Sequence, residues 1–248
     1  MIDIAGIAFQ ILQSMLVVLA APALLGWVNQ CRAWLQNRTG PGVLRPYFLI
    51  WRLFQKEAVV ADNASVLFRA TPYILFGCMW LAAGIVPVLA TDLPFAFAAD
   101  IIALVGIFAL ARVFIALAAM DIGTSFGGIG ARREMLIGFL AEPAMLMTLF
   151  TAAFLSGSTA LTTIVETLAH REFAIHPGLA CAAVAFTMVT LAENARIPVD
   201  NPTTHLELTM IHEAMILEYS ARHLALIEWA TAIKLFAYMT IGIALFTP

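Results

Sequence analysis

Long runs of apolar residues, separated by polar segments, dominate the chain. A helix that spans a bilayer needs roughly 20 mostly apolar residues. Six runs fit this requirement, and the fifth, which is short, is expected to continue into residues 193–195. They are Ile4–Val28, Tyr73–Thr91, Asp100–Met120, Met135–Gly157, Pro177–Ala192 and Leu224–Phe246. The pattern predicts an all-α fold, a polytopic transmembrane helix bundle with about six spanning helices.

Two polar segments, 29–72 and 193–223, are too long for simple helix connections. In the first, apolar residues of 46–57 recur at helical spacing, with Arg52 and Lys56 four apart. This spacing predicts an amphipathic helix on the membrane surface after the first span.

The second segment is expected to break into two helices. Glu193 and Arg196 are three apart, so they are expected to pair on one helical face, which Pro198 then ends. Asp200 or Asn201 is expected to cap the next helix, which runs from Thr203 to Tyr219. Its ionisable residues near the membrane edge are candidates for accepting and passing protons: Glu207, His212, Glu213 and Glu218.

Composition places the whole chain, residues 1–248, in one integral membrane domain. Of the residues 62% are hydrophobic and 12% are charged, with a mean hydropathy of +0.93, against about 25% charged in soluble domains. A net charge of −3 indicates no surface for nucleic acid. The three cysteines are isolated, whereas an iron–sulfur cluster normally needs four thiolates, and position 216 of a would-be H-E-x-x-H motif is Ile. We therefore expect no catalytic residue, metal ligand or cofactor in this chain.

Lysine and arginine predict the orientation. Ten cations fall in three connections that lie on one side, and the opposite side has only Arg171. The positive-inside rule then puts the basic connections in the cytoplasm and the N-terminus outside the cytoplasmic (inner) membrane. The ten are Arg32, Arg38, Arg45, Arg52, Lys56, Arg69, Arg132, Arg133, Arg196 and Arg222.

Four charged residues fall inside predicted spans: Arg112, Glu142, Glu228 and Lys234. A charge at the bilayer centre costs roughly 3 kcal/mol or more unless it has a partner or a wet cavity. One interpretation is a polar path through the bundle for protons or coupling. The other is a buried ion pair that fixes helix packing, such as Arg112 with Glu142, while Lys234 snorkels to an interface.

The polar segments contain motifs that resemble the membrane NADH dehydrogenase subunit 1 family, which respiratory complex I and membrane-bound [NiFe] hydrogenases share. The resemblance covers essentially the whole chain. The matching motifs are Asn37-Arg38-x-Gly40-Pro41, Lys56-Glu57, Gly127 to Arg133 followed by Glu142, Glu193-x-x-Arg196-x-Pro198-x-Asp200, Glu207-Leu208 and Glu218-Tyr219-Ser220.

Within this family the chain looks like the hydrogenase branch, that of hydrogenase-4 component C and formate hydrogenlyase subunit 4. The stretches 61–65 and 121–128 are similar to that branch. The complex I branch continues its second motif with Pro-Phe-Asp and a pair of glutamates that help line the quinone cavity. Here Val199 replaces the phenylalanine, and Asn201–His205 stands where the acidic pair is expected.

The resemblance implies a membrane subunit of a group 4 [NiFe] hydrogenase complex, which anchors a peripheral redox arm and couples electron transfer to proton translocation. The [NiFe] and iron–sulfur centres would belong to neighbouring large and small subunits, and antiporter-like membrane subunits would adjoin. Docking residues would be Arg38, Gly40, Pro41, Lys56, Glu57, Arg132 and Arg133. Coupling residues would be Arg112, Glu142, Glu193, Arg196, Asp200, Glu207, Glu213, Glu218, Glu228 and Lys234.

Other interpretations remain open from the sequence. The family fold has about eight spanning helices, so either part of the C-terminus is missing or this member is short. The rival functions are a quinone-site subunit of a complex I-like enzyme, an independent ion transporter, and a purely structural anchor. No repeat relates the two halves of the chain, although transporters often contain such repeats.

Overall fold

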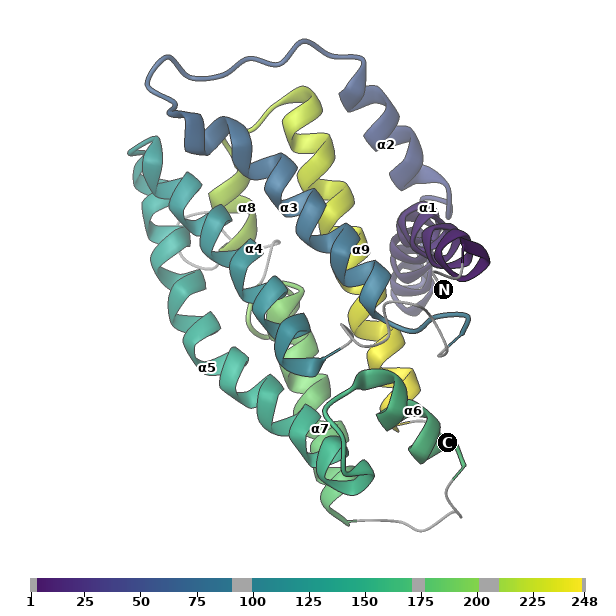
Figure 1. Cartoon of the computed structure of the whole chain (residues 1–248). Coiled ribbons are helices and arrows are strands. Elements are labelled where there is room, and N and C mark those ends of the chain that lie inside the picture. The colour runs from purple at the N-terminus through teal and green to yellow at the C-terminus, as the bar shows by residue number, and fades with distance from the viewer. Residues whose placement is uncertain (1–3, 91–99, 171–176, 201–209, 247–248) are drawn as a thin grey trace.

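The computed structural model describes residues 4–90, 100–170, 177–200 and 210–246, and the helices in these ranges form a bundle (Figure 1). They are α1 (Ile4–Leu35), α2 (Arg45–Phe54), α3 (Val66–Ile85), α4 (Ile101–Asp121), α5 (Ser125–Ser156), α6 (Leu161–Ala169), α7 (Pro177–Glu193), α8 (His212–Ile216) and α9 (Ala221–Phe246). The predicted all-α class and the amphipathic helix after the first span are confirmed.

Five helices, α1, α3, α4, α5 and α9, are long and apolar enough to cross a membrane, and α7 is a shorter apolar helix. Two of them, α3 and α5, begin seven or more residues earlier than predicted. α3 begins at Val66 because the Ser65 hydroxyl accepts the Leu67 amide and caps it. α5 begins at Ser125, ten residues before the apolar run, and so includes two arginines and a glutamate that hydropathy assigns to a connection.

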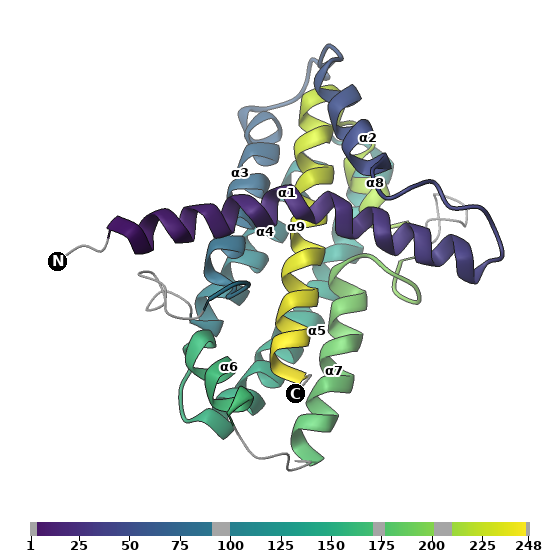
Figure 2. The same cartoon turned by 90° about the vertical axis from the view of Figure 1, so that its right-hand side faces the viewer.

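α1 runs across α3 and α9 instead of along them (Figure 2). Polar groups hold it at this angle, because the buried Gln13 amide donates to the Val86 carbonyl and accepts the Leu89 amide. Trp80 also donates to the Ser14 hydroxyl. With 32 residues α1 is about 48 Å long, enough to cross a hydrocarbon core of about 30 Å even when tilted by about 50°.

Aromatic side chains satisfy two carbonyls that prolines leave free. Pro22 and Pro72 lie inside α1 and α3, and each lacks the N–H that would bond to the carbonyl four residues earlier. Trp229 Nε1 donates to the Val18 carbonyl at 2.8 Å, and the Tyr219 hydroxyl donates to the Phe68 carbonyl at 3.1 Å. The start of α9 is thereby tied to both helices.

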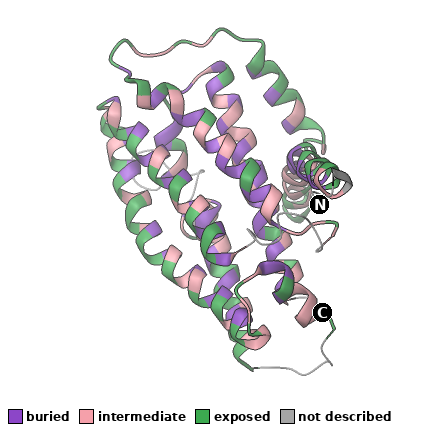
Figure 3. Cartoon of the chain, in the orientation of Figure 1, coloured by how far each residue is buried: buried purple, intermediate pink, exposed green. Residues whose placement is uncertain are grey.

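The core lies between α3, α4, α5 and α9, and the outward faces of these helices are apolar and exposed (Figure 3). Phe68, Leu104, Leu149 and Ile233 are almost fully buried, whereas Phe139 and Phe154 on α5 are 76% and 90% exposed. Such outward apolar faces suit a lipid or a membrane partner, which fits a multi-pass membrane protein.

The three basic connections meet at one end of the bundle, as predicted. Val59 exchanges hydrogen bonds with the Ser220 hydroxyl, which links the first connection to the last. Asn63 donates to the Ile122 carbonyl, and the Ser65 amide donates to the Asp121 carboxylate. The two stretches that resemble the hydrogenase branch, 61–65 and 121–128, therefore bind each other.

Candidate functional site

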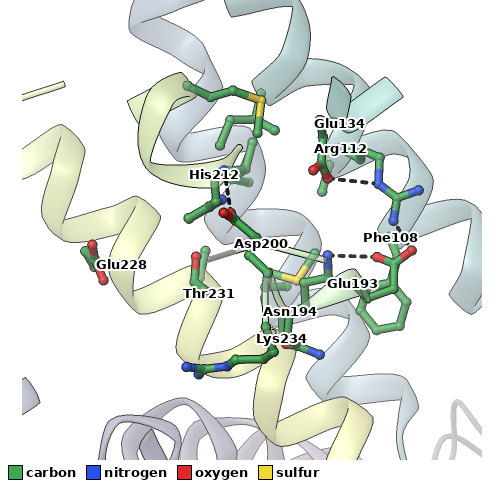
Figure 4. A pocket seen from close by; sticks show the side chains of 18 of the residues that line it. Phe108, Arg112, Glu134, Glu193, Asn194, Asp200, His212, Glu228, Thr231 and Lys234 are labelled. Atoms are coloured by element: carbon green, nitrogen blue, oxygen red, sulfur yellow. Dashed lines mark hydrogen bonds and ion pairs between the residues drawn. The ribbon is translucent and has the colours of Figure 1, made fainter. Parts of the chain in front are cut away.

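A cavity of about 310 Å³ lies inside the bundle, near the end where the basic connections meet (Figure 4). Side chains from α1, α3, α4, α5, α7, α8 and α9 line it, together with the turn 194–200. Its lining combines apolar residues such as Leu75 and Phe108 with charged ones. Among the described residues, no cluster of three or more His, Cys, Asp or Glu side chains is arranged to hold a metal ion.

Arg112 on α4 is the centre of the charged lining and is buried. Its Nη1 lies 2.7 Å from Glu142 Oε1, its Nε lies 3.3 Å from Glu134 Oε1, and its Nη2 pairs with Glu193. The predicted pair of Arg112 and Glu142 is confirmed. Three carboxylates from α5 and α7 converge on one guanidinium, whose planar fork of donors can serve several acceptors at once.

Lys234 on α9 extends the ion pairs across the bundle. Its Nζ lies 2.9 Å from Glu193 Oε2 and 5.9 Å from the centre of the Tyr238 ring. The interpretation that Lys234 snorkels to an interface is therefore wrong, because the side chain turns inward to a buried carboxylate. Glu193 joins the two cations, so a continuous chain of charges, hereafter the charge network, runs Glu142–Arg112–Glu193–Lys234, with Glu134 attached.

Sequence reasoning missed three residues of this site: Glu134, Gly138 and Tyr238. Glu134, Gly138 and Glu142 are spaced by four, so they form one stripe of α5 that faces Arg112. A Cβ added at Gly138 would lie 2.7 Å from Arg112 Cδ, so only glycine leaves room for the arginine there. The spacing of four was the available signal, but Glu134 fell outside the predicted span.

The predicted pair of Glu193 and Arg196 is wrong. α7 ends at Glu193, well before Pro198, and Ala195 has a φ of +49°, which turns the chain away from the helix. Glu193 pairs instead with Arg112 and Lys234, while Arg196 lines the cavity, as Asn29 of α1 also does. Burial, and then the neighbouring Arg32 charge, lower the pKa of Arg196.

Asp200 caps a helix, but a later one than predicted. Its carboxylate accepts the backbone amides of Ile211 at 3.2 Å and His212 at 3.0 Å, at the start of α8. In the described residues the expected helix over 203–219 reduces to His212–Ile216, because the chain turns at Leu217 and Glu218. Asn201, Glu207 and the 201–205 stretch lie outside the described residues.

The remaining candidates divide between the cavity and the surface. Glu213 and Glu228 line the cavity, and in Figure 4 Glu228 stands apart from the charge network. Glu218 is exposed at the basic end. Of the docking candidates, five side chains are exposed and two are partly covered; the exposed ones are Arg38, Pro41, Lys56, Glu57 and Arg132, and the others are Gly40 and Arg133.

α8 closes the cavity at the basic end by packing on α5. A Cβ at Gly130 would lie 3.0 Å from the Ile211 carbonyl and 3.1 Å from Ala214 Cβ, so glycine permits this close approach. Burial lowers the pKa of His212, the first residue of α8, which therefore is neutral near pH 7. A neutral imidazole next to Asp200 and Glu213 is able to accept a proton from the cavity.

Comparisons with known proteins agree with this architecture. The chain is 33% identical over 243 residues to formate hydrogenlyase subunit 4 of Escherichia coli, covering 98% of this chain and 78% of that protein. It is also 33% identical to hydrogenase-4 component C of the same organism, covering 98% and 76%. A solved archaeal respiratory membrane complex, the membrane-bound sulfane sulfur reductase, contains a chain with the same fold, with a TM-score of 0.80 at 20% identity over 98% of this chain and 79% of that one. The sequence profile described as NADH dehydrogenase matches residues 8–248, and the chain belongs to this family, the complex I subunit 1-like membrane proteins.

Proposed function

We propose that this chain is the membrane subunit of a group 4 [NiFe] hydrogenase complex, of the hydrogenase-4 or formate hydrogenlyase type. It anchors the peripheral redox arm and couples electron transfer there to proton translocation. The observation that carries the proposal is the buried charge network, which reaches from the cavity beneath the basic end to the lateral face of α5. The two E. coli relatives supply the type of complex.

Docking of the redox arm would take place at the basic end. The exposed residues Lys56 and Glu57 lie on the first connection and Arg132 near the start of α5, and hydrogen bonds tie that connection to residues 121 and 122 just before α5, so these residues form one preassembled surface. The [NiFe] and iron–sulfur centres would reside in the large and small hydrogenase subunits bound there. Because the cavity lies near this end of the bundle, a charge that changes in the redox arm would act on the groups lining it.

Coupling would rest on an imbalance of charge. The network contains three carboxylates, Glu134, Glu142 and Glu193, and two cations, Arg112 and Lys234, so it carries one excess negative charge when all are ionised. In a low-dielectric interior such an excess favours uptake of a proton or rearrangement of the pairs. An electron arriving near the cavity would therefore change the proton affinity of the network.

A second membrane subunit would cover the lateral face of α5. The Glu142 side chain is 34% exposed there, beside the exposed Phe139, Leu140 and Met147, and Pro143 leaves the Phe139 carbonyl without its helical donor. A carboxylate and a free carbonyl are costly against hydrocarbon. A partner helix with a hydrogen-bond donor removes this cost, which suits an antiporter-like subunit.

The coupling role is tested by measuring how many protons the complex moves per hydrogen in inverted membrane vesicles. Glu142→Gln preserves the shape of the side chain, so we expect the complex to assemble and turn over hydrogen while proton movement per hydrogen falls. Glu166→Gln on α6, away from the network, is the matched control. Unchanged proton movement in Glu142→Gln would contradict the coupling role.

The proposal as a whole has a second test. Replacing Glu193 or Asp200 by alanine is expected to impair hydrogen turnover or recovery of the assembled complex, since one removes the centre of the network and the other frees α8. Normal turnover together with intact assembly in both variants would count against the proposal.

The cavity supports one rival, a quinone site in a complex I-like enzyme. Its volume of about 310 Å³ falls at the low end of small-molecule pockets, which span roughly 300–1,000 Å³. Quinone retained by the purified complex, or loss of activity with quinone-site inhibitors, would favour this rival. Activity that depends on hydrogen and is insensitive to such inhibitors would favour the hydrogenase role.

A further inference from the structure

Two arginines from separate segments lie in the region where α1 borders the cavity. Arg196 in the turn after α7 lines the cavity together with Leu25 and Asn29 of α1. Arg32 follows Asn29 by three residues, so it continues the same face of α1 by one helical turn. Burial, and then the Arg32 charge, lower the pKa of Arg196, which agrees with this placement of the two side chains.

Neither arginine has a counter-ion in the described parts of the chain. Arg112 and Lys234 both form ion pairs with carboxylates there, but Arg32 and Arg196 form none. Arg196 is partly buried, so its charge is incompletely solvated, and Arg32 is exposed beside it. Two like charges in this position repel, and an anion bound between them would remove the repulsion and supply hydrogen-bond acceptors to both.

An apolar groove continues from this pair along α1. Trp27, Val28, Cys31 and Leu35 line it, and Arg32 with Gln36 form its polar end. Trp27 and Trp34 contact each other edge to face, with ring centres 5.7 Å apart, and both are about half exposed. Exposed tryptophans beside arginines are typical of sites where lipid headgroups meet the hydrocarbon.

We propose that Arg32 and Arg196 bind the phosphate of an anionic phospholipid, whose acyl chain lies in the groove of α1. The groove explains why the occupant is a lipid, since the acidic side chain of a protein partner would leave the apolar lining uncovered. The site is separate from the charge network and does not depend on the proposed function. A lipid in this position ties α1 to the turn after α7.

Thermal unfolding of the full chain in detergent tests the site. Added phosphatidylglycerol is expected to raise the unfolding midpoint of the wild-type chain more than phosphatidylcholine does. Arg32→Gln and Arg196→Gln should each lose most of this gain, and the double variant should lose no more than the larger single loss, because both act on one phosphate. Arg222→Gln, an exposed arginine at the start of α9, is the matched control and should keep the gain.

Native mass spectrometry of the wild-type chain tests the site without any variant, so its result does not depend on whether a variant folds. We expect bound phosphatidylglycerol to survive detergent removal more often than phosphatidylcholine. Equal retention of both lipids, or a full gain in the double variant, would overturn the proposal. If inorganic phosphate raises the unfolding midpoint as much as phosphatidylglycerol does, the site is a simple anion site. If Arg32→Gln affects only subunit assembly, the site binds a protein partner. Either result rejects the lipid.

Discussion

Arg112 shows how one side chain organises a site inside a membrane protein. A buried guanidinium is tolerated only when its charge is compensated, and Glu134, Glu142 and Glu193 place three carboxylates around it. Glu193 also forms an ion pair with a second cation, Lys234. Removing Glu193 would therefore leave two cations underpaired.

Glu193→Ala is expected to lower the free energy of unfolding by about 3–5 kcal/mol, the usual cost of breaking a buried pair from one side. Thermal or denaturant unfolding of the chain in detergent measures this loss. Glu166→Ala on α6 removes a carboxylate outside the network and should change stability by less than about 1 kcal/mol. Equal losses in the two variants would show that the network contributes nothing particular.

Tyr219→Phe tests the bond to the carbonyl that Pro72 leaves free. The hydroxyl donates to the Phe68 carbonyl, while the rings of Tyr219 and Phe68 stack at 3.9 Å and are unaffected by the change. We expect a loss of about 1–2 kcal/mol. In a Pro72→Ala background the alanine N–H can bond to the same carbonyl, so the loss from Tyr219→Phe should shrink. An equal loss in both backgrounds would contradict the compensation.

Part of the site was predictable from single residues. Arg112 and Glu142 stand out because an apolar run makes each charge expensive, and expensive charges need partners. The contact of Glu134 with Arg112 was signalled only by its spacing of eight residues from Glu142, and nothing in the sequence indicated that Gly138 lies against Arg112. The true partners of Glu193 depend on where α7 ends, which Ala195 decides by adopting a positive φ.

The stripe of α5 that faces Arg112 predicts opposite effects for two glycines on one helix. Gly138→Ala places a methyl group within 2.7 Å of Arg112 Cδ, whereas nothing lies within 4 Å of a Cβ at Gly128. Gly138→Ala should displace the guanidinium from Glu142 and destabilise the chain by about 2 kcal/mol or more. Gly128→Ala should be neutral or gain up to about 1 kcal/mol of helix propensity. Unfolding midpoints measure both, and a stable Gly138→Ala variant would contradict the packing.

α8 is expected to loosen as the pH falls. Burial lowers the pKa of His212, with Glu213 and Asp200 opposing the shift and Lys234 and Arg196 adding to it. Because the folded pKa lies below the ordinary value of 6.5, the undocked helix binds more protons, so docking is fully stable above about pH 6.5 and weakens below it.

Hydrogen exchange of residues 211–216 between pH 7.5 and 5.5 measures this loosening after correction for the intrinsic rate. His212→Asn, which does not titrate, should remove the pH dependence and leave the exchange of α9 unchanged. Exchange in α8 that is independent of pH in the wild-type chain would contradict a neutral, partly buried imidazole at His212.

Helix positions were more predictable than helix ends. Hydropathy reports which residues can face lipid, and it found the apolar parts of α3, α4, α5, α7 and α9. It does not report backbone hydrogen bonding, so the polar first turns of α3 and α5 were assigned to connections. The short α6 in the connection after α5 also lacked a sufficiently long apolar run.

The direction of α1 could not be predicted from the pattern of apolar residues. Hydropathy gives length and not angle, and α1 crosses the bundle because Gln13 and Ser14 bond to the end of α3 while Trp229 bonds to Val18. By contrast, the grouping of the basic connections followed from the number of spans between them. In the structure, hydrogen bonds join these connections, so all three must lie on the same side of the membrane.

Cysteine labelling in oriented membrane vesicles tests which side that is. In a chain whose native cysteines are replaced by serine, Lys56→Cys, Arg132→Cys and Arg222→Cys should all react with an impermeant thiol reagent from the cytoplasmic side, because cations are retained there. Thr159→Cys, at the opposite end of α5, should react from outside. Disagreement among the first three would contradict the joined connections. Agreement on the outer side would leave the structure intact but remove the docking surface from the compartment where a soluble redox arm is available.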